Sequence, residues 1–187
     1  YKNLKVSIDS FKQIRDLFYD KLESAELIPN LSFDICLKNN YLKKHFFKKE
    51  LPWYIMFRFN LYESKNKFYN RFEDQFKLIS DNISDILIPN SIDQEKKIWK
   101  FRDDLVEAYK INSKVITNDI SIPLNRMEEF FNVAEDNIKK ILPNIQFHPF
   151  GHIGDGNIHF NMIVPQSISS ESYIQIRDNI YFYINTL

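Results

Sequence analysis

All the glycine in this 187-residue chain lies in one short stretch. The three glycines, Gly151, Gly154 and Gly156, fall within the segment Phe150–His159. Glycine adopts positive φ readily and lets another backbone approach closely, so it marks tight turns and ligand sites. The rest of the chain must fold with ordinary backbone geometry. The sequence therefore predicts one special turn, at Gly154–Asn157, between two strands.

Apolar spacing along the chain changes repeatedly between helix and strand periods. The two kinds of element follow each other irregularly, which favours an α+β fold with a largely antiparallel sheet and helices packed mainly on one face. The predicted strands are Leu4–Ile8, Ala25–Ile28, Trp53–Leu61 as a central strand, Ile86–Ile88, Lys114–Ile122, Ile145–Phe150 and Asn157–Val164. The predicted helices are Phe11–Leu22, Asn30–Lys38, Phe68–Ile79, Asp93–Tyr109, a segment with Pro123 in its first turn that runs to about Leu142, and Glu171–Thr186.

Charge and cysteine content exclude several classes of protein. Lys+Arg and Asp+Glu balance at 25 each, so no basic field is available to attract nucleic acid. No apolar run approaches the roughly 20 residues that span a bilayer, and no signal peptide is recognisable. The single cysteine, Cys36, cannot form an internal disulfide and is predicted to be a buried structural residue. These features predict a cytoplasmic protein, with peripheral membrane contact left open.

The lysine-rich segment Lys43–Lys49 around His45 is the one local concentration of positive charge. A solvated face is favoured there over contact with an anionic membrane. The chain begins at Tyr1 without methionine and stops at Leu187 within an apolar-rich run. We therefore expect a single domain, residues 1–187, cut from a longer protein at both ends.

Three of the four histidines, His148, His152 and His159, lie beside the glycines. His152 precedes the predicted turn and His159 follows it, so a tight turn brings both imidazoles to one spot. Two neutral imidazoles are good ligands for a divalent ion such as Zn²⁺, but a third ligand, which we expect to be a carboxylate, must come from elsewhere. Asn161 lies two residues beyond His159 on the same side of the strand and is placed to hydrogen-bond a ligand at the metal. A glycine-rich turn with histidines is also an ordinary hairpin, and the residues alone leave both interpretations open.

The segment Gly151-His-Ile-Gly-Asp-Gly-Asn-Ile-His159 strongly resembles the signature of the C-terminal domain of FAD-linked oxidases. This family includes D-lactate dehydrogenases, the glycolate oxidase flavin subunit and D-2-hydroxyglutarate dehydrogenase. Three more segments resemble the family in the same order, so the resemblance covers nearly the whole chain. They are Ser24-Ala-Glu-Leu27, Ile98-Trp-Lys-Phe-Arg102 and Asn118-Asp-Ile-Ser-Ile-Pro-Leu124.

The resemblance implies roles for four residues. His152 and His159 would bind a divalent metal such as zinc or manganese, and Asn161 would contact the substrate. Arg102 would pair with the substrate carboxylate, for which a guanidinium fork is well suited. Without the resemblance, Arg102 would be interpreted as a solvated helix residue in a local ion pair. His148 has no matched role and is predicted at the surface or behind the metal ligands.

The implied reaction oxidises a 2-hydroxy acid to the 2-oxo acid, with hydride passing to FAD. In the family, the FAD-binding domain is N-terminal to this region, and a Glu-His pair just beyond the position of Leu187 supplies the third metal ligand and the base. We therefore expect no catalytic residue within the chain, no activity from this piece alone and weak metal binding at most. The implied partners are the small acid and an electron acceptor, and a homo-oligomer is compatible with the sequence.

Two departures from the family pattern bear on the substrate. The hydroxyglutarate enzymes carry a threonine one helical turn after the arginine, where this chain has Val106. They also carry a lysine two residues before the Asp-x-Ser-x-Pro aspartate, where this chain has Thr117. Both residues help hold the second carboxylate of a diacid. Their absence favours a D-lactate-like or glycolate-like substrate.

Two alternatives belong to other classes of protein. One is a free-standing metal-binding module, whose third ligand would have to be His148 or Asp155. The other is a non-catalytic interaction domain of α+β type, in which His152 and His159 would carry no activity.

Overall fold

The computed structural model describes residues 1–62, 64–77, 79–111 and 113–186. Its centre is a six-stranded sheet in the order β2-β1-β5-β6-β3, with β4 also paired to β6. Every strand pairing within the described ranges is antiparallel. The strands are β1 (Leu22–Pro29), β2 (Trp53–Phe59), β3 (Lys114–Ile116), β4 (Asp119–Ser121), β5 (Gln146–His152) and β6 (Asn157–Val164).

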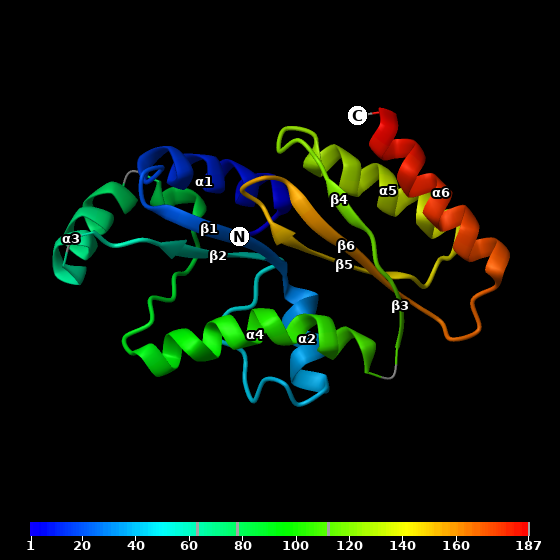
Figure 1. Cartoon of the computed structure of the whole chain (residues 1–187), viewed down its shortest axis with the longest axis horizontal. Helices are drawn as coiled ribbons and strands as arrows, with labels where there is room; N and C mark the ends of the chain where they lie inside the picture. Colours follow the sequence, from blue (N-terminus) through cyan, green and yellow to red (C-terminus); the bar gives the residue numbers. More distant parts are fainter. Residues whose placement is uncertain (63, 78, 112, 187) are drawn as a thin grey trace.

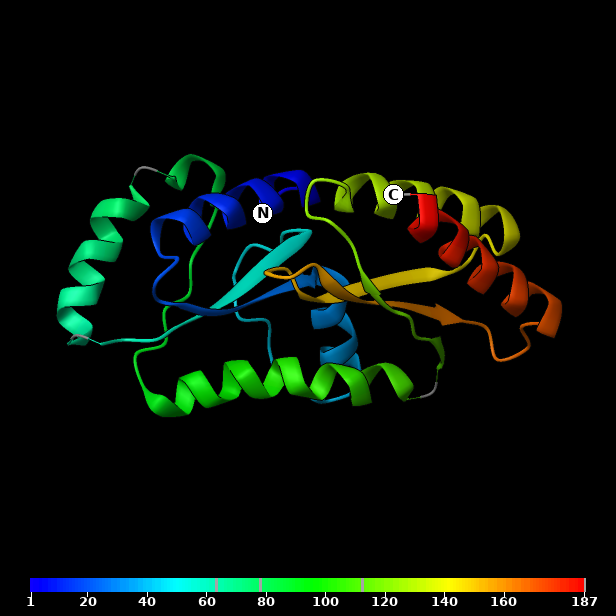
Figure 2. The same ribbon diagram turned by 45° about the horizontal axis from the view of Figure 1, so that its top comes forward.

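Helices cover both faces of this sheet (Figures 1 and 2). The larger group, α1 (Leu4–Leu17), α5 (Met127–Ile141) and α6 (Ser170–Thr186), packs on one face, while α2 (Asn30–Lys38) and α4 (Ile92–Lys110) pack on the other. Helix α3 (Lys65–Phe76) and the short 3-10 helix η1 (Ser80–Asn82) lie at the β2 end of the molecule. The predicted α+β class and antiparallel sheet are confirmed.

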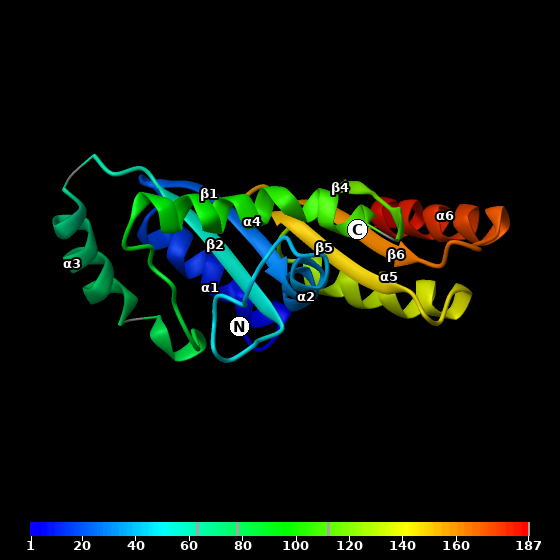
Figure 3. The same cartoon turned by 90° about the horizontal axis from the view of Figure 1, so that it is seen from below.

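The alternation of side chains along β6 explains why the two faces differ. Ile158, Phe160 and Met162 point into the larger core, beneath α1, α5 and α6. Successive strand residues point to opposite faces, so Asn157, His159 and Asn161 lie on the face that carries α2 and α4. Seen from that side, α4 runs across the front of the sheet (Figure 3). The polar residues of β6 are thus directed toward α4 instead of the main core.

Most predicted elements are found close to their expected bounds. The helices over Asn30–Lys38, Asp93–Tyr109 and Glu171–Thr186 are confirmed, as are the strands over Ala25–Ile28, Ile145–Phe150 and Asn157–Val164. The helix predicted over Phe68–Ile79 is present as α3, and position 78 of that prediction lies outside the described residues. These bounds are predictable because each element has regular apolar spacing over a long segment or a strong turn beside it.

The predicted strand at Leu4–Ile8 is wrong, because these residues open α1. Leu4 and Ile8 are four apart, so they fit a helical stripe as well as an alternating strand. The side chain of Asn3 accepts a hydrogen bond from the backbone N–H of Val6, which caps the helix. Helix α1 ends at Leu17, short of its predicted end at Leu22, and Leu22 is the first residue of β1.

Strand β2 exists but is not central. It pairs only with β1 among the described strands and so forms one edge of the sheet. Its aromatic side chains pack on helices instead of a second strand; Phe59, for example, contacts Phe18, Phe68 and Phe72. An aromatic run predicts burial, and here helices cover these side chains in part.

Three smaller predictions also need correction. Ile86–Ile88 is irregular and partly exposed, so it is not a strand. Lys114–Ile122 divides into β3 and β4, although Asn118 between them still bonds the backbone of Phe160. Pro123 does not lie in the first turn of α5, which begins at Met127. Within the described residues, no helix is long and apolar enough to cross a bilayer.

The predicted glycine turn connects β5 to β6. It leaves His152 paired with Asn157, and Gly151 and Gly156 both have positive φ, +148° and +73°. At Gly156 an added Cβ would lie 2.1 Å from the carbonyl oxygen of Ile122. The backbone N–H of Ile122 bonds the carbonyl of Gly156, so this contact joins the turn to the end of β4.

We predict that Gly156→Ala lowers the free energy of unfolding by more than about 2 kcal/mol, because it combines left-handed strain with a backbone clash. Urea unfolding of the chain measures this change. Gly154→Ala is the matched control, since a Cβ there has nothing within 4 Å and φ is not positive. Equal stability losses in the two variants would contradict the prediction.

Candidate functional site

The two motif histidines meet on the α4 face of the β5–β6 hairpin. His152 is the last residue of β5, and His159 lies on β6 opposite Phe150. Their ring centroids are 6.4 Å apart, and the ring of Phe150 lies 5.1 Å from that of His159. The turn therefore brings the two imidazoles together, as the sequence predicted.

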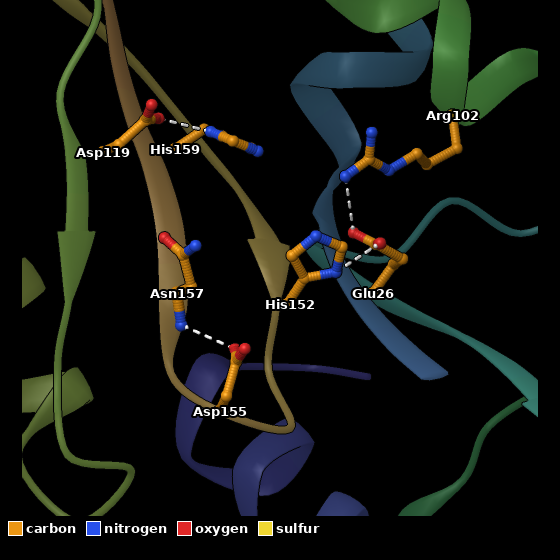
Figure 4. Close-up of polar contacts among 7 residues, drawn as sticks. All are labelled: Glu26, Arg102, Asp119, His152, Asp155, Asn157 and His159. Atoms are coloured by element: carbon orange, nitrogen blue, oxygen red, sulfur yellow. Dashed lines mark hydrogen bonds and ion pairs between the residues drawn. The ribbon is translucent and has the colours of Figure 1, made fainter. Parts of the chain in front are cut away.

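Each histidine is held by a carboxylate at Nδ1. His152 Nδ1 lies 2.8 Å from Glu26 Oε1, and His159 Nδ1 lies 2.5 Å from Asp119 Oδ1. A carboxylate can only accept a hydrogen bond, so each Nδ1 carries a proton, and in the neutral imidazole Nε2 then keeps a lone pair. Figure 4 shows the Nε2 sides of both rings directed toward a common space that also faces Arg102. Carboxylate-held imidazoles of this kind are the usual arrangement of metal-binding histidines.

Glu26 links His152 to helix α4. It is 2% exposed on β1, where it is paired with His152 across the sheet. Its Oε2 accepts a hydrogen bond of 3.1 Å from Arg102, so one buried carboxylate contacts both a histidine and a guanidinium. A buried carboxylate needs such partners, because its charge is poorly solvated there.

Arg102 lies against the site and is not a solvated helix residue. Its side chain is 16% exposed, and its guanidinium carbon is 5.5 Å from the centroid of the Phe150 ring. Its ionic partner Glu26 is distant in the sequence, which excludes the alternative of a solvated residue in a local pair. Trp99, the other fixed residue of the Trp-x-x-Arg segment, stacks on Arg58 at 4.0 Å from the ring centroid.

Asn161 and His148 form the next cross-strand pair on this face of the sheet, two residues along from Phe150 and His159. Asn161 lies on the His159 face as predicted, is 5% exposed, and its buried Oδ1 has no hydrogen-bond partner in the described part of the chain. His148 is 1% exposed, so of its two predicted positions the one at the surface is excluded. Its ring packs 5.1 Å from that of Tyr109, and burial lowers its pKa to about 4.

Among the described residues, no group of three or more His, Cys, Asp and Glu side chains is arranged to hold a metal ion. Asp155, a rival third ligand, accepts a hydrogen bond from the backbone N–H of Asn157 within the turn. His148 is buried beside Tyr109, behind Asn161. In the described part of the chain, the hairpin thus brings together the imidazoles of His152 and His159, which is fewer ligands than a closed metal site has.

Sequence reasoning missed Glu26 and Asp119 as site residues. Both lie in segments that carry the family resemblance, but only as parts of a pattern. Asp119 is the β4 residue directly opposite His159, and Glu26 is the β1 residue opposite His152. The missing signal was the order of the strands, which composition and local spacing do not specify.

The remaining site predictions have simpler outcomes. Cys36 is fully buried, as predicted, and burial raises the pKa of its thiol to about 12. The lysines of Lys43–Lys49 are exposed, whereas His45 stacks on Phe33 at 4.2 Å. A cavity of about 300 Å³ lies between β2, α3 and the start of α4, and neither motif histidine, Arg102 nor Asn161 lines it.

The described residues form an α+β domain that carries a carboxylate-held histidine pair on one face of an antiparallel sheet. Residues 7–181 match the family described as FAD linked oxidases, C-terminal domain. The chain belongs to this family.

Curated relatives carry dehydrogenase names. A D-2-hydroxyglutarate dehydrogenase of Xanthomonas citri pv. viticola is 29% identical over 98 residues, which cover 52% of this chain and 21% of that protein. A mitochondrial protein of Schizosaccharomyces pombe, provisionally named D-lactate dehydrogenase, is 26% identical over 183 residues, 89% of this chain and 33% of that protein. The chain therefore spans a third or less of the length of these relatives.

A solved structure supports the fold alone. An alkyldihydroxyacetonephosphate synthase superposes with a TM-score of 0.54 at 10% sequence identity. The match covers 100% of this chain and 38% of that one.

The buried His148 predicts a pH dependence of stability. Because its pKa falls from 6.5 to about 4 in the folded state, the unfolded chain takes up a proton first as the pH is lowered. The contribution of His148 is fully present above about pH 6.5 and is lost as the pH falls toward 4, which we expect to cost up to about 3 kcal/mol. Urea unfolding between pH 7 and pH 4 should therefore show a shallower decline in His148→Gln than in the wild type. Parallel curves would contradict this.

Proposed function

We propose that this chain is the substrate- and metal-binding cap of a flavin-dependent 2-hydroxy-acid dehydrogenase, whose flavin domain is another part of the same protein. One observation carries the proposal. The Nε2 sides of His152 and His159 face a common space beside Arg102, on a family scaffold of FAD-linked oxidases (Figure 4).

The donor set of the site fits half of a divalent metal centre. Imidazole nitrogens suit zinc, whereas manganese would need oxygen ligands in addition. The Nδ1 partners Glu26 and Asp119 favour the neutral tautomer that leaves Nε2 available. We propose that at least one further ligand, and the catalytic base, belong to a segment outside this chain. Bound there, a divalent cation would lower the pKa of a substrate hydroxyl that it coordinates.

Arg102 would recognise the substrate carboxylate. Its guanidinium is anchored on one side by Glu26 and lies over the Phe150 ring, which restricts its orientation. A planar cation held in this way can donate further hydrogen bonds to a carboxylate in a defined plane. Asn161, buried on the same face as His159, would supply its amide to the bound acid. The flavin would accept hydride, which is the chemistry of the cofactor itself.

Two positions at which this chain departs from the family pattern favour a small acid over a diacid. Val106, one turn beyond Arg102 on α4, is apolar and 41% exposed, and Thr117 carries no charge. Neither residue can neutralise a second carboxylate. The relatives carry both D-2-hydroxyglutarate and D-lactate names, so we propose D-lactate or glycolate as the substrate on these two positions.

The metal assignment predicts which residues lower metal content. In the intact protein, His152→Ala and His159→Ala should each weaken metal binding by more than about 100-fold, because losing even a hydrogen-bond partner of a ligand costs about 10–100-fold. Elemental analysis after dialysis measures this loss. His148→Gln and Asp155→Asn should keep the metal. If either of these two loses it, the free-standing module is the better description.

The carboxylate assignment predicts a change in KM. Arg102→Lys keeps the charge but loses the fork, so KM for the acid should rise about 10-fold or more. A screen of D-lactate, glycolate and D-2-hydroxyglutarate with a dye acceptor should find one of the two small acids preferred. Arg177→Lys on the exposed face of α6 is the matched control. Unchanged KM in Arg102→Lys would overturn this role for Arg102, and intact activity in His152→Ala would favour a non-catalytic domain.

A further inference from the structure

A single carboxylate lies between the two halves of the proposed site. Glu26 Oε1 is 2.8 Å from His152 Nδ1, and Glu26 Oε2 is 3.1 Å from Arg102. The side chain of Glu26 is 3% exposed, so water does not compete strongly for either oxygen. Figure 4 shows both contacts made by the one carboxylate, from β1 to β5 and from β1 to α4.

From this geometry we infer that Glu26 is the positioning residue that couples metal binding at His152 to carboxylate recognition at Arg102. The inference rests on the proposed function and adds a residue that neither binds the metal nor touches the substrate. It also predicts that the two histidines differ, although each has a carboxylate partner.

The donor requirements of the two partners make Glu26 hard to replace. Arg102 can only donate hydrogen bonds, and His152 must donate from Nδ1 whenever Nε2 binds a metal. In this geometry each partner contacts its own oxygen, and a carboxylate offers two accepting oxygens. The glutamine amide has one oxygen and one NH₂, so in Glu26→Gln the NH₂ must face a donor on one side or the other.

This conflict defines the direction of the coupling. Metal at Nε2 stabilises the Nδ1–H form of His152, and that form favours the Glu26 orientation that also holds Arg102. By linkage, whatever fixes Arg102 in turn favours the metal-binding tautomer. In Glu26→Gln, the metal-bound state and the anchored state of Arg102 exclude each other.

Asp119 provides the internal comparison. It contacts His159 at Nδ1, but its side chain is 72% exposed and no ion pair joins it to an arginine in the described residues. Asp119→Asn should therefore weaken metal binding and leave carboxylate recognition intact. Glu23 lies three residues before Glu26 on β1, is exposed, and serves as the control for Glu→Gln on this strand.

The test uses the intact flavoprotein as wild type, Glu26→Gln, Asp119→Asn and Glu23→Gln. The dissociation constant for Zn²⁺ alone, from competition with a chromogenic chelator, should rise about 10-fold or more in Glu26→Gln and Asp119→Asn. At saturating Zn²⁺, KM for the best acid of the screen should rise about 10-fold in Glu26→Gln, with a smaller change in kcat. It should stay within twofold in Asp119→Asn, and Glu23→Gln should match the wild type in both measurements.

Nitrogen-15 NMR of the metal-free protein adds a readout that needs no turnover. The Nδ1–H tautomer of His152 should dominate in the wild type and in Asp119→Asn, and decline in Glu26→Gln. Glu26→Asp is the second variant in case Glu26→Gln does not fold. Its shorter side chain keeps the charge but cannot span both partners, so either the Zn²⁺ dissociation constant or KM should rise at least fivefold.

The outcomes separate this inference from the proposed function. If the wild type binds Zn²⁺ and oxidises an acid, but the folded Glu26 variants change neither Zn²⁺ affinity nor KM, the coupling role is overturned. A change in Zn²⁺ affinity alone in Glu26→Gln also overturns it, since Glu26 would then match Asp119. If instead no acid is oxidised but Glu26→Gln still shifts the His152 tautomer and Zn²⁺ affinity, the proposed function fails while the hold of Glu26 on His152 stands.

Discussion

The antiparallel pairing of β5 with β6 across the glycine turn is the constraint on which the site depends. It places His152 and His159 on one face and gives that face to α4, while Ile158 and Phe160 enter the opposite core. The turn cannot accommodate a side chain at Gly156, because the backbone of Ile122 occupies that space. A one-residue slip of this hairpin would exchange the faces and bury the histidines among aromatic rings.

Around this hairpin the fold supplies one partner for each site residue from a different element. Strand β1 brings Glu26 to His152, β4 brings Asp119 to His159, and α4 brings Arg102 to Glu26. The polar atoms are arranged so that the acidic groups hold the imidazoles at Nδ1. The resulting concentration of ligand nitrogens and a guanidinium suits an anionic acid held at a cation.

The sequence predicts those features of the fold that depend on a few neighbouring residues. The turn, its flanking strands and the long helices were found because glycine chemistry and 3.6-residue spacing act over a few residues. The start of the first helix resembles a strand because Leu4 and Ile8 satisfy both periods. Strand β2 resembles a central strand because of its aromatic residues, although helices supply part of their burial. Arg102 was assigned by resemblance, whereas Glu26 and Asp119 depend on strand order, which pairing between distant segments determines.

The sequence separations within the site have a consequence for how it forms. The Asp119–His159 contact spans 40 residues and the Arg102–Glu26 contact spans 76. Contacts between distant segments form late, since the intervening chain must first lose its freedom. A growing chain would therefore leave its histidines unoriented until β1 and β4 have joined the hairpin, so the paired geometry of the two rings forms only with the sheet.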